Sequence, residues 1–290
     1  MVKSTRTKVI DLLIALFCLL LIFICLLPLL NVLSRSLSSD QALIKRQVLL
    51  WPVEFTFESY YYVLKDAAFS HSLWWTAFLT VICTCVSMIM TILCAYPLTY
   101  DNLKGKKIIN TIIIMTMYFS AGTIPNYILM KNLDLLNKPL VLIIPNCLSV
   151  FNMIILRSFF YSIPESLKES AELDGANPFI VLIRIYLPLS TSALATLALF
   201  YAVGRWNGFS DALMYMTTPQ YAPIQLKLYN IINNLSAIDT AQVEGSATSP
   251  TVSEGLKAAS VMFATIPILI VYPWLQRYFI SGVTIGAVKG

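Results

Sequence analysis

The chain has 290 residues and a net charge of +5, with 58% hydrophobic and 12% charged residues and a mean hydropathy of +0.74. A soluble protein of this length needs more polar surface than this composition supplies, so the chain is predicted to be a membrane protein. The basic residues are scattered between apolar runs, which argues against nucleic-acid binding, and a large soluble catalytic domain has no room to exist.

Apolar runs between the charged residues predict a single all-helical membrane domain, residues 1–290, with six transmembrane helices. Each span needs about 20 residues to cross the hydrocarbon core. The first run is longer than the apolar part of a signal peptide, so we expect it to be retained. Pro97, Pro125 and Pro145 are expected to kink their helices. The spans are predicted at about residues 10–31, 72–99, 108–130, 139–160, 185–208 and 257–276, with a loop at 162–188 and a tail at 277–290.

The distribution of basic residues indicates the orientation of these spans. An even number of spans places both termini on one side of the membrane. The short segments on that side collect basic residues near 3–8, 104–107, 157–184 and 277–289, whereas those of the other side are spread over two long loops. Because basic residues of short loops stay inside, both termini and the loop at 162–188 are predicted to be cytoplasmic.

The two long outer loops are predicted at residues 32–71 and 205–257. Aromatic residues are dense in the first loop, as expected for an anchor at the membrane–water boundary, although a platform for a partner or for sugar rings is an alternative. The second loop contains a polar stretch, residues 245–250, that is expected to be flexible and outside any folded domain. The aromatic residues of the first loop are Trp51, Phe55, Phe57, Tyr60, Tyr61 and Tyr62.

The cytoplasmic loop at 162–188 has the local signals of two short helices joined by a turn. Ser162 and Glu165 have the spacing of a capping box, and Gly175 can adopt the left-handed conformation that ends a helix. Asn177 is expected to cap the second helix, which runs toward Pro188, where the chain bends into the fifth span. The local pattern alone also fits a solvated, charged loop.

The same loop carries a spaced motif, Glu169-Ser170-Ala171-x-x-Asp174-Gly175-Ala176, followed ten residues after Gly175 by Ile185 and then by Leu187-Pro188. This motif resembles the EAA loop of binding-protein-dependent ABC importer permeases, with Ser170 where that family usually has alanine. The resemblance extends over most of the chain. Residues 120–127, 204–207 and 272–290 look like the carbohydrate-uptake class, similar to the maltose-type second permease and particularly to the complex-oligosaccharide subgroup.

The resemblance implies the fold of a type I ABC importer permease in a bacterial cytoplasmic membrane. It implies a second permease subunit, two ATP-binding subunits that hold ATP and Mg²⁺, and an extracellular, lipid-anchored substrate-binding protein that delivers an oligosaccharide. The chain lacks a Gly-x-x-x-x-Gly-Lys-Ser/Thr phosphate-binding loop, so we expect no catalytic residue, cofactor or enzymatic activity of its own. By resemblance, the residues that couple to the ATPase are Glu169, Ser170, Ala171, Asp174, Gly175, Ala176 and Pro188.

Polar side chains inside the spans are candidates for the translocation pathway, because such groups are costly in a membrane unless they face a cavity or a neighbour. Trp206 and Asn207 combine an indole face with an amide, which together can stack on and hydrogen-bond a sugar ring. Tyr127 and Asn152 are further candidates. The alternative is that these amides form structural hydrogen bonds between helices.

Other functional classes remain open on the sequence alone. An ion-coupled secondary transporter would carry several ionisable residues at mid-membrane depth, whereas no charge interrupts the apolar runs that define the spans. A membrane-embedded scaffold would not need the acidic residues of the loop, and a permease for a non-sugar solute would keep the same loop. The six cysteines lie in apolar runs and the single histidine, His71, lies at a span edge, so no metal site is expected.

Overall fold

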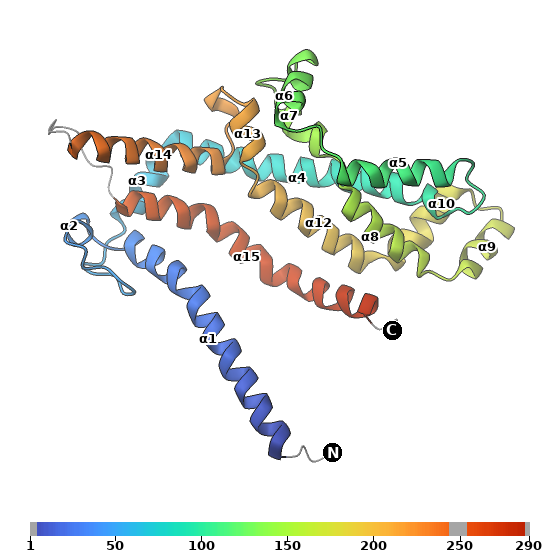
Figure 1. The fold of residues 1–290 in the computed structure, drawn as a ribbon, viewed down its shortest axis with the longest axis horizontal. Coiled ribbons are helices and arrows are strands. Elements are labelled where there is room, and N and C mark those ends of the chain that lie inside the picture. The colour runs from blue at the N-terminus through green and yellow to red at the C-terminus, as the bar shows by residue number, and fades with distance from the viewer. Residues whose placement is uncertain (1–4, 244–253, 288–290) are drawn as a thin grey trace. The chain divides into compact units, whose positions relative to one another are not determined.

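The computed structural model describes the backbone of residues 5–243 and 254–287 and the side chains of residues 10–233 and 254–273. All regular secondary structure in this described part is helical, which confirms the predicted all-helical class (Figure 1). The polar stretch at 245–250 lies outside it. The chain falls into two compact units, residues 1–70 with 227–266 and residues 71–226 with 267–290, and each is described by itself.

The described helices range from three residues in α11 to 34 residues in α15. They are connected by three 3₁₀ turns, η1 (Pro97–Thr99), η2 (Ile144–Asn146) and η4 (Pro219–Tyr221), and by a π-helical turn, η3 (Leu182–Tyr186). In chain order the helices are α1 (Thr5–Ser36), α2 (Asp40–Ile44), α3 (Glu58–Lys65), α4 (Ala67–Ala95), α5 (Lys106–Tyr118), α6 (Thr123–Asn132), α7 (Leu140–Ile143), α8 (Val150–Tyr161), α9 (Glu165–Leu173), α10 (Pro178–Val181), α11 (Leu187–Leu189), α12 (Thr191–Trp206), α13 (Ser210–Tyr215), α14 (Ile224–Val243) and α15 (Glu254–Ala287).

Three helical segments of the described residues are long and apolar enough to cross a membrane unbroken, namely Ile10–Ser36, Ala67–Thr99 and Glu254–Pro273. Three further segments reach that length only as bent pairs, so the number of spans rises to six if each pair is one span. The third, fourth and fifth expected spans therefore differ from continuous helices. The bent pairs are Lys106–Tyr118 with Thr123–Asn132 (114°), Leu140–Asn146 with Val150–Tyr161 (48°) and Pro178–Leu189 with Thr191–Trp206 (83°).

Local chemistry explains where the helices break. Pro97 and Pro145 have no N–H to donate, and each begins or lies within a 3₁₀ turn at a helix end. Gly122, which precedes α6, has a φ of +90°, a conformation that side chains disfavour. Pro125 differs from expectation, because it lies in the first turn of α6, where proline is tolerated, and the sharp bend comes before it.

The first unit contains segments that were expected to be outer loops, and they are more helical than expected. α2 and α3 lie within the expected loop 32–71, and α14 occupies much of the expected loop 205–257. Searching for uninterrupted apolar runs missed these helices, because polar residues separate their apolar positions. An ion pair between Arg35 and Glu254 connects α1 to α15, and Phe69 packs edge-on against Phe263 with 6.0 Å between ring centroids.

The second unit is built around a core of α4, α8, α12 and the segment that contains α10 and η3. Met153 and Leu156 of α8 are fully buried there, together with Val181 of α10 and Leu197 of α12. A separate cluster joins the first half of α4 to α7 and α13. In this unit, Figure 1 shows α9 and α10 at one end, next to the start of α5, and α7 and α13 toward the other end.

α9 and α10 form where the loop sequence predicted two helices. Gly175 adopts a φ of +80°, and the N–H of Ala176 donates to the carbonyl of Ala171 at 2.9 Å, so α9 ends in the predicted left-handed turn. The side-chain oxygen of Asn177 accepts a hydrogen bond from the N–H of Ile180 at 2.9 Å, which confirms the predicted cap of α10.

The predicted capping box at the start of α9 is wrong. Pro164 stands directly before the helix, and it makes no side-chain cap. The hydroxyl of Ser162 donates instead to the carbonyl of Phe159 at 2.7 Å. The Ser162 hydroxyl therefore bonds to the last turn of α8 and does not cap the first turn of α9.

The expected bend near Pro188 is present. α10 continues through η3 into α11, and the chain then turns by 83° into α12. Because Pro188 cannot donate a hydrogen bond, the regular α-helical pattern cannot continue through it. The N–H of Ser190 bonds to the carbonyl of Tyr186 at 3.0 Å and closes the last turn before the bend.

Candidate functional site

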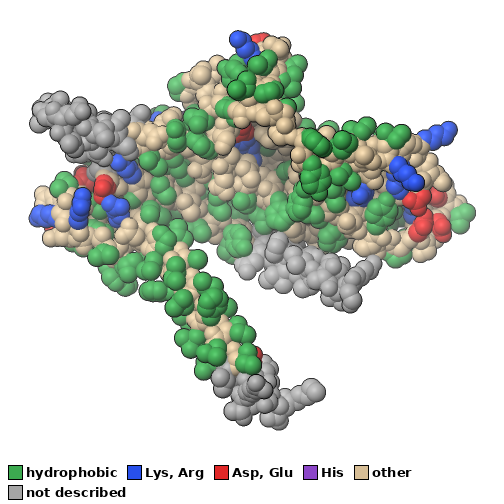
Figure 2. Space-filling view, viewed as in Figure 1, with side chains coloured by type: hydrophobic (Ala, Val, Ile, Leu, Met, Phe, Trp, Pro, Cys, Tyr) green, Lys and Arg blue, Asp and Glu red, His purple; other side chains and the backbone are tan. Residues whose placement is uncertain are grey.

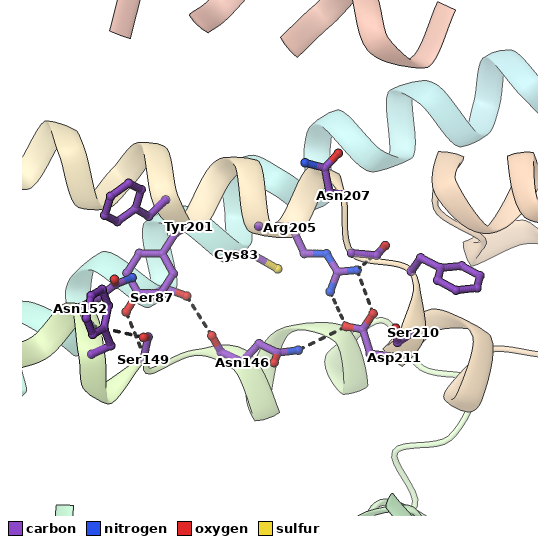
Figure 3. A pocket seen from close by; sticks show the side chains of 15 residues that line it. Cys83, Ser87, Asn146, Ser149, Asn152, Tyr201, Arg205, Asn207, Ser210 and Asp211 are labelled. Carbon is purple, nitrogen blue, oxygen red and sulfur yellow. Dashed lines mark hydrogen bonds and ion pairs between the residues drawn. The ribbon is translucent and has the colours of Figure 1, made fainter. Parts of the chain in front are cut away.

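A cavity of about 740 Å³ opens in the second unit between α4, α8, α12 and the chain that leads into α13 (Figure 3). Its wall combines amides, hydroxyls and aromatic rings with one buried ion pair. Phe151 and Phe200 expose about half of their surfaces, 54% and 40% respectively. The lining residues are Cys83, Ser87, Asn146, Ser149, Phe151, Asn152, Phe200, Tyr201, Gly204, Arg205, Asn207, Gly208, Phe209, Ser210 and Asp211.

Arg205 and Asp211 form the charged part of this wall. The two guanidinium nitrogens of Arg205 contact the two carboxylate oxygens of Asp211 at 2.5 and 3.2 Å, a bidentate geometry. Only 6% of the Arg205 side chain and 19% of the Asp211 side chain is exposed. Asn146 donates a further hydrogen bond to Asp211 at 3.2 Å (Figure 3). Since the two buried charges neutralise each other, this part of the wall has no net charge.

A glycine makes room for the ion pair. A Cβ atom at Gly208 would lie 2.6 Å from the terminal nitrogen of Arg205, closer than such contacts occur. The same nitrogen donates to the carbonyl of Gly208 at 3.2 Å. Through this hydrogen bond, Arg205 holds the turn between α12 and α13 against the end of α12. The turn can come this close to the guanidinium only because residue 208 has no side chain.

We expect Gly208→Ala to destabilise the protein by about 1–3 kcal/mol, because the new methyl group must displace a guanidinium that Asp211 holds in place. Gly204→Ala is the matched control, since a Cβ atom there meets nothing within 4 Å. Thermal unfolding of the two purified variants in detergent measures the difference. Equal midpoints for the two variants would show that the ion pair does not occupy this space.

Hydroxyl groups connect the three helices on the other side of the cavity. The hydroxyl of Tyr201, on α12, accepts a hydrogen bond from the N–H of Ser149 at 3.0 Å and lies 2.7 Å from the hydroxyl of Thr91 on α4. Ser87 of α4 donates to the carbonyl of Asn146 at 3.3 Å. α4 is therefore bonded to α12 and to the segment that leads into α8, through two separate sets of hydrogen bonds beside the cavity.

The structure separates the residues that the sequence predicted for the pathway. Asn152 and Asn207 both line the cavity, and Figure 3 shows the Asn207 amide pointing away from the Arg205–Asp211 pair. Trp206 is buried, with 8% of its surface exposed, and lines a different, apolar groove of about 510 Å³ with Trp74. Tyr127 does not line the cavity; its ring stacks on Tyr215 with 6.1 Å between centroids.

Sequence reasoning missed the importance of Arg205. Arg205 fell within the predicted fifth span, 185–208, and also at the start of the predicted outer loop, 205–257, whereas α12 continues through Trp206 and buries Arg205 in its last turn. No charge interrupts the apolar run before it, but the span itself ends on a buried charge. A usable signal was present: an arginine, a glycine three residues later and an aspartate three residues after that can form a turn closed by an ion pair.

The residues predicted to couple to an ATPase lie on or beside α9. Glu169, Ser170 and Asp174 are exposed, and Figure 2 shows acidic side chains gathered over α9. Ala171 and Ala176 are half-buried and pack against the core of the second unit. Gly175 forms the turn, and Pro188 is exposed at the far end of the segment. The exposed acidic face and the packed alanine face are thus opposite sides of one short helix and its turn.

Comparison with known proteins gives full-length relatives. A family model described as the binding-protein-dependent transport system inner membrane component matches residues 67–285. The polygalacturonan/rhamnogalacturonan transport system permease protein YtcP of Bacillus subtilis is 37% identical over 285 residues, 98% of this chain and 100% of that protein. Protein LplC of the same organism is 40% identical over 271 residues, 92% of this chain and 90% of that protein.

Solved structures share the fold. A chain of a bacterial ABC transporter involved in the import of the acidic polysaccharide alginate has a TM-score of 0.86 and 32% identity, covering 96% of this chain and 99% of that one. A second chain, from a bacterial alginate ABC transporter in complex with a pentasaccharide-bound periplasmic protein, has a TM-score of 0.62 and 16% identity over 95% and 96% of the two chains, and supports the fold alone. The protein is a multi-pass membrane permease and belongs to the family of binding-protein-dependent transport system inner membrane components.

Proposed function

We propose that this chain is one of two permease subunits of an ATP-driven importer of oligosaccharides. The single observation that carries the proposal is the cavity lined by amides, hydroxyls and exposed phenyl rings inside a membrane permease. Polar groups at membrane depth are costly unless they serve a cavity or a partner. Two relatives support the substrate class, since their names or titles refer to polygalacturonan and rhamnogalacturonan or to alginate.

The chemistry of the cavity suits a saccharide. Sugar rings present hydroxyls that exchange hydrogen bonds with amides and hydroxyls, and C–H faces that stack on aromatic rings. Asn152, Asn207 and Ser87 supply the polar groups, and Phe151 and Phe200 supply the rings. Trp206 and Tyr127, which lie outside this wall, have no role in the proposed pathway.

Energy is proposed to come from two separate ATP-binding subunits that hold ATP and Mg²⁺ and dock on α9. The exposed acidic residues of α9 and the left-handed turn at Gly175 support this assignment, because a short helix with a defined end offers a partner an exposed, ordered binding surface. With both termini cytoplasmic, α9 faces the cytoplasm. A lipid-anchored extracellular binding protein would deliver the substrate to the opposite side.

The test is uptake by the assembled importer, isolated through an affinity tag on this chain and reconstituted in vesicles. We expect labelled oligogalacturonides to accumulate only with ATP inside and binding protein outside, and the isolated chain to hydrolyse no ATP. Hydrolysis by the chain alone, or uptake that follows an ion gradient without ATP, would overturn the proposal. Accumulation of a non-sugar solute in preference to every glycan tested would retain the importer and reject the oligosaccharide.

A further inference from the structure

The residue directly after α4 is bonded to α10, the second helix of the segment 162–188, which forms an elbow. The hydroxyl of Tyr96 donates to the carbonyl of Pro178, the first residue of α10, at 2.8 Å, and lies 2.6 Å from the hydroxyl of Tyr100. The ring of Tyr96 packs edge-on against Tyr186 at 5.1 Å and against Phe160 at 6.3 Å. Tyr96 is 6% exposed, so both its ring and its hydroxyl are fixed by their neighbours.

Lys168 of α9 places its ammonium group beside Tyr100. The ammonium group of Lys168 lies 4.1 Å from the centroid of the Tyr100 ring, within the range of a cation–π contact. It also lies 3.9 Å from the carboxylate of Glu165, one turn earlier on α9. Only 15% of the Lys168 side chain is exposed, whereas Leu173 at the end of the helix is 88% exposed. Lys168 is therefore a point at which α9 contacts the chain that follows α4 and η1.

An apolar surface groove lies beside this contact. A hollow of about 500 Å³ is lined by Leu93 and Pro97 from α4 and η1 and by Phe179 and Leu182 from the elbow. The Tyr96 ring itself lies in the buried core with Val181 and Tyr186. The hydroxyl bond from Tyr96 thus adds a directional contact to a packed junction.

α4 extends from this contact to the cavity wall. Cys83 and Ser87 of α4 line the cavity, and Thr91 is bonded to Tyr201 of α12. From Ser87 to Tyr96 the rise of the helix is roughly 13 Å. Because α4 is one unbroken helix over this distance, a displacement applied near Tyr96 moves the cavity wall as well.

We propose that Tyr96, Tyr100 and Lys168 form a tyrosine joint that transmits the displacement of α9 and α10 to α4, and through α4 to the cavity. These three are positioning residues, since none of them lines the cavity. The inference rests on the proposed function, because ATP-binding subunits docked on α9 supply the displacement. The joint connects two cytoplasmic segments, the end of α4 and the elbow, that are far apart in the sequence.

The test measures substrate taken up per ATP hydrolysed by the reconstituted importer. Tyr96→Phe keeps the ring and removes the hydroxyl, and Lys168→Met keeps the length of the side chain and removes the charge. We expect each variant to lower this ratio roughly fivefold while ATP hydrolysis continues. A factor of this size corresponds to the free energy of one lost polar contact. Lys168→Arg retains a cation over the ring and should restore the ratio.

Exposed matched residues provide the controls. Tyr118→Phe and Lys107→Met make the same chemical changes away from the joint and should leave the ratio unchanged. If the two residues act through one joint, the double variant Tyr96→Phe/Lys168→Met should have about the same ratio as each single variant. Additive losses would indicate two independent contacts and contradict the joint.

The outcomes separate this inference from the proposed function. If the wild-type importer couples ATP hydrolysis to uptake and both single variants keep the full ratio, the joint is rejected and the importer stands. If the variants only reduce the amount of assembled complex while the ratio is unchanged, the residues are structural and the joint is also rejected. If the wild-type importer shows no ATP-dependent uptake, the proposed function itself fails.

Discussion

Asp211→Ala is expected to lower the stability of the protein by about 3–5 kcal/mol, because it leaves the guanidinium of Arg205 buried without its counter-charge. The remaining hydrogen bonds of Arg205, to the carbonyls of Gly208 and Leu142 at 3.2 and 3.4 Å, cannot neutralise the charge. Thermal unfolding of the detergent-solubilised complex measures the loss, and we expect little of the variant to accumulate in the membrane.

Two further variants distinguish an unpaired charge from a lost contact. Asp211→Ala combined with Arg205→Met removes both charges and should recover most of the stability, since a buried pair can be replaced by apolar groups at little cost. Asp101→Ala is the control, because its ion pair with Lys106 leaves the aspartate side chain 84% exposed and should change stability little. If the double variant is no more stable than Asp211→Ala, the unpaired charge is not the cause.

The double variant Glu169→Ala/Asp174→Ala is expected to lower uptake at least about tenfold while the chain still inserts and folds, because both side chains are exposed on α9 and would contact an ATP-binding subunit. Their removal takes two charges from that interface and leaves the packed face of α9, with Ala171, unchanged. Uptake into vesicles and the amount of tagged chain in the membrane are measured in parallel.

Asp101→Ala is the control for this prediction. Asp101 is exposed on the turn between α4 and α5 and pairs with Lys106 at 2.8 Å. The hydrogen bond from the Lys106 ammonium lowers the pKa of the Asp101 carboxyl, so the variant removes a fully ionised group at neutral pH. It should leave uptake unchanged. Full uptake by the Glu169→Ala/Asp174→Ala variant would favour a scaffold that needs no motor subunit.

Local signals in the sequence were sufficient where one short segment determines its own conformation. Gly175 and Asn177 end and begin helices through bonds to residues a few positions away, so their roles could be predicted without the fold. The capping box predicted at Ser162 rested on an equally local pattern and was wrong, because the Ser162 hydroxyl donates to a carbonyl at the end of α8 instead. The sequence pattern of one helix does not show that a neighbouring helix binds the same hydroxyl.

The candidate site was harder to predict, because neighbours in sequence need not face the same space. Successive residues of an α-helix point about 100° apart, so Trp206 and Asn207 at the end of α12 line different hollows. Asn146 and Asp211 meet across 65 positions of sequence, and Tyr127 stacks on Tyr215 across 88 positions. Such contacts depend on the packing of helices, which no local spacing specifies.

The central claim is that α9 is the contact with the ATP-binding subunits, and a photo-cross-linking amino acid at position 173 tests it most directly. Leu173 is 88% exposed at the end of α9, and Trp51, 82% exposed in the first unit, is the matched site on the predicted outer side. In the assembled importer we predict an adduct between residue 173 and an ATP-binding subunit, and none from residue 51. An assembled importer in which residue 173 forms no adduct with that subunit would contradict the account.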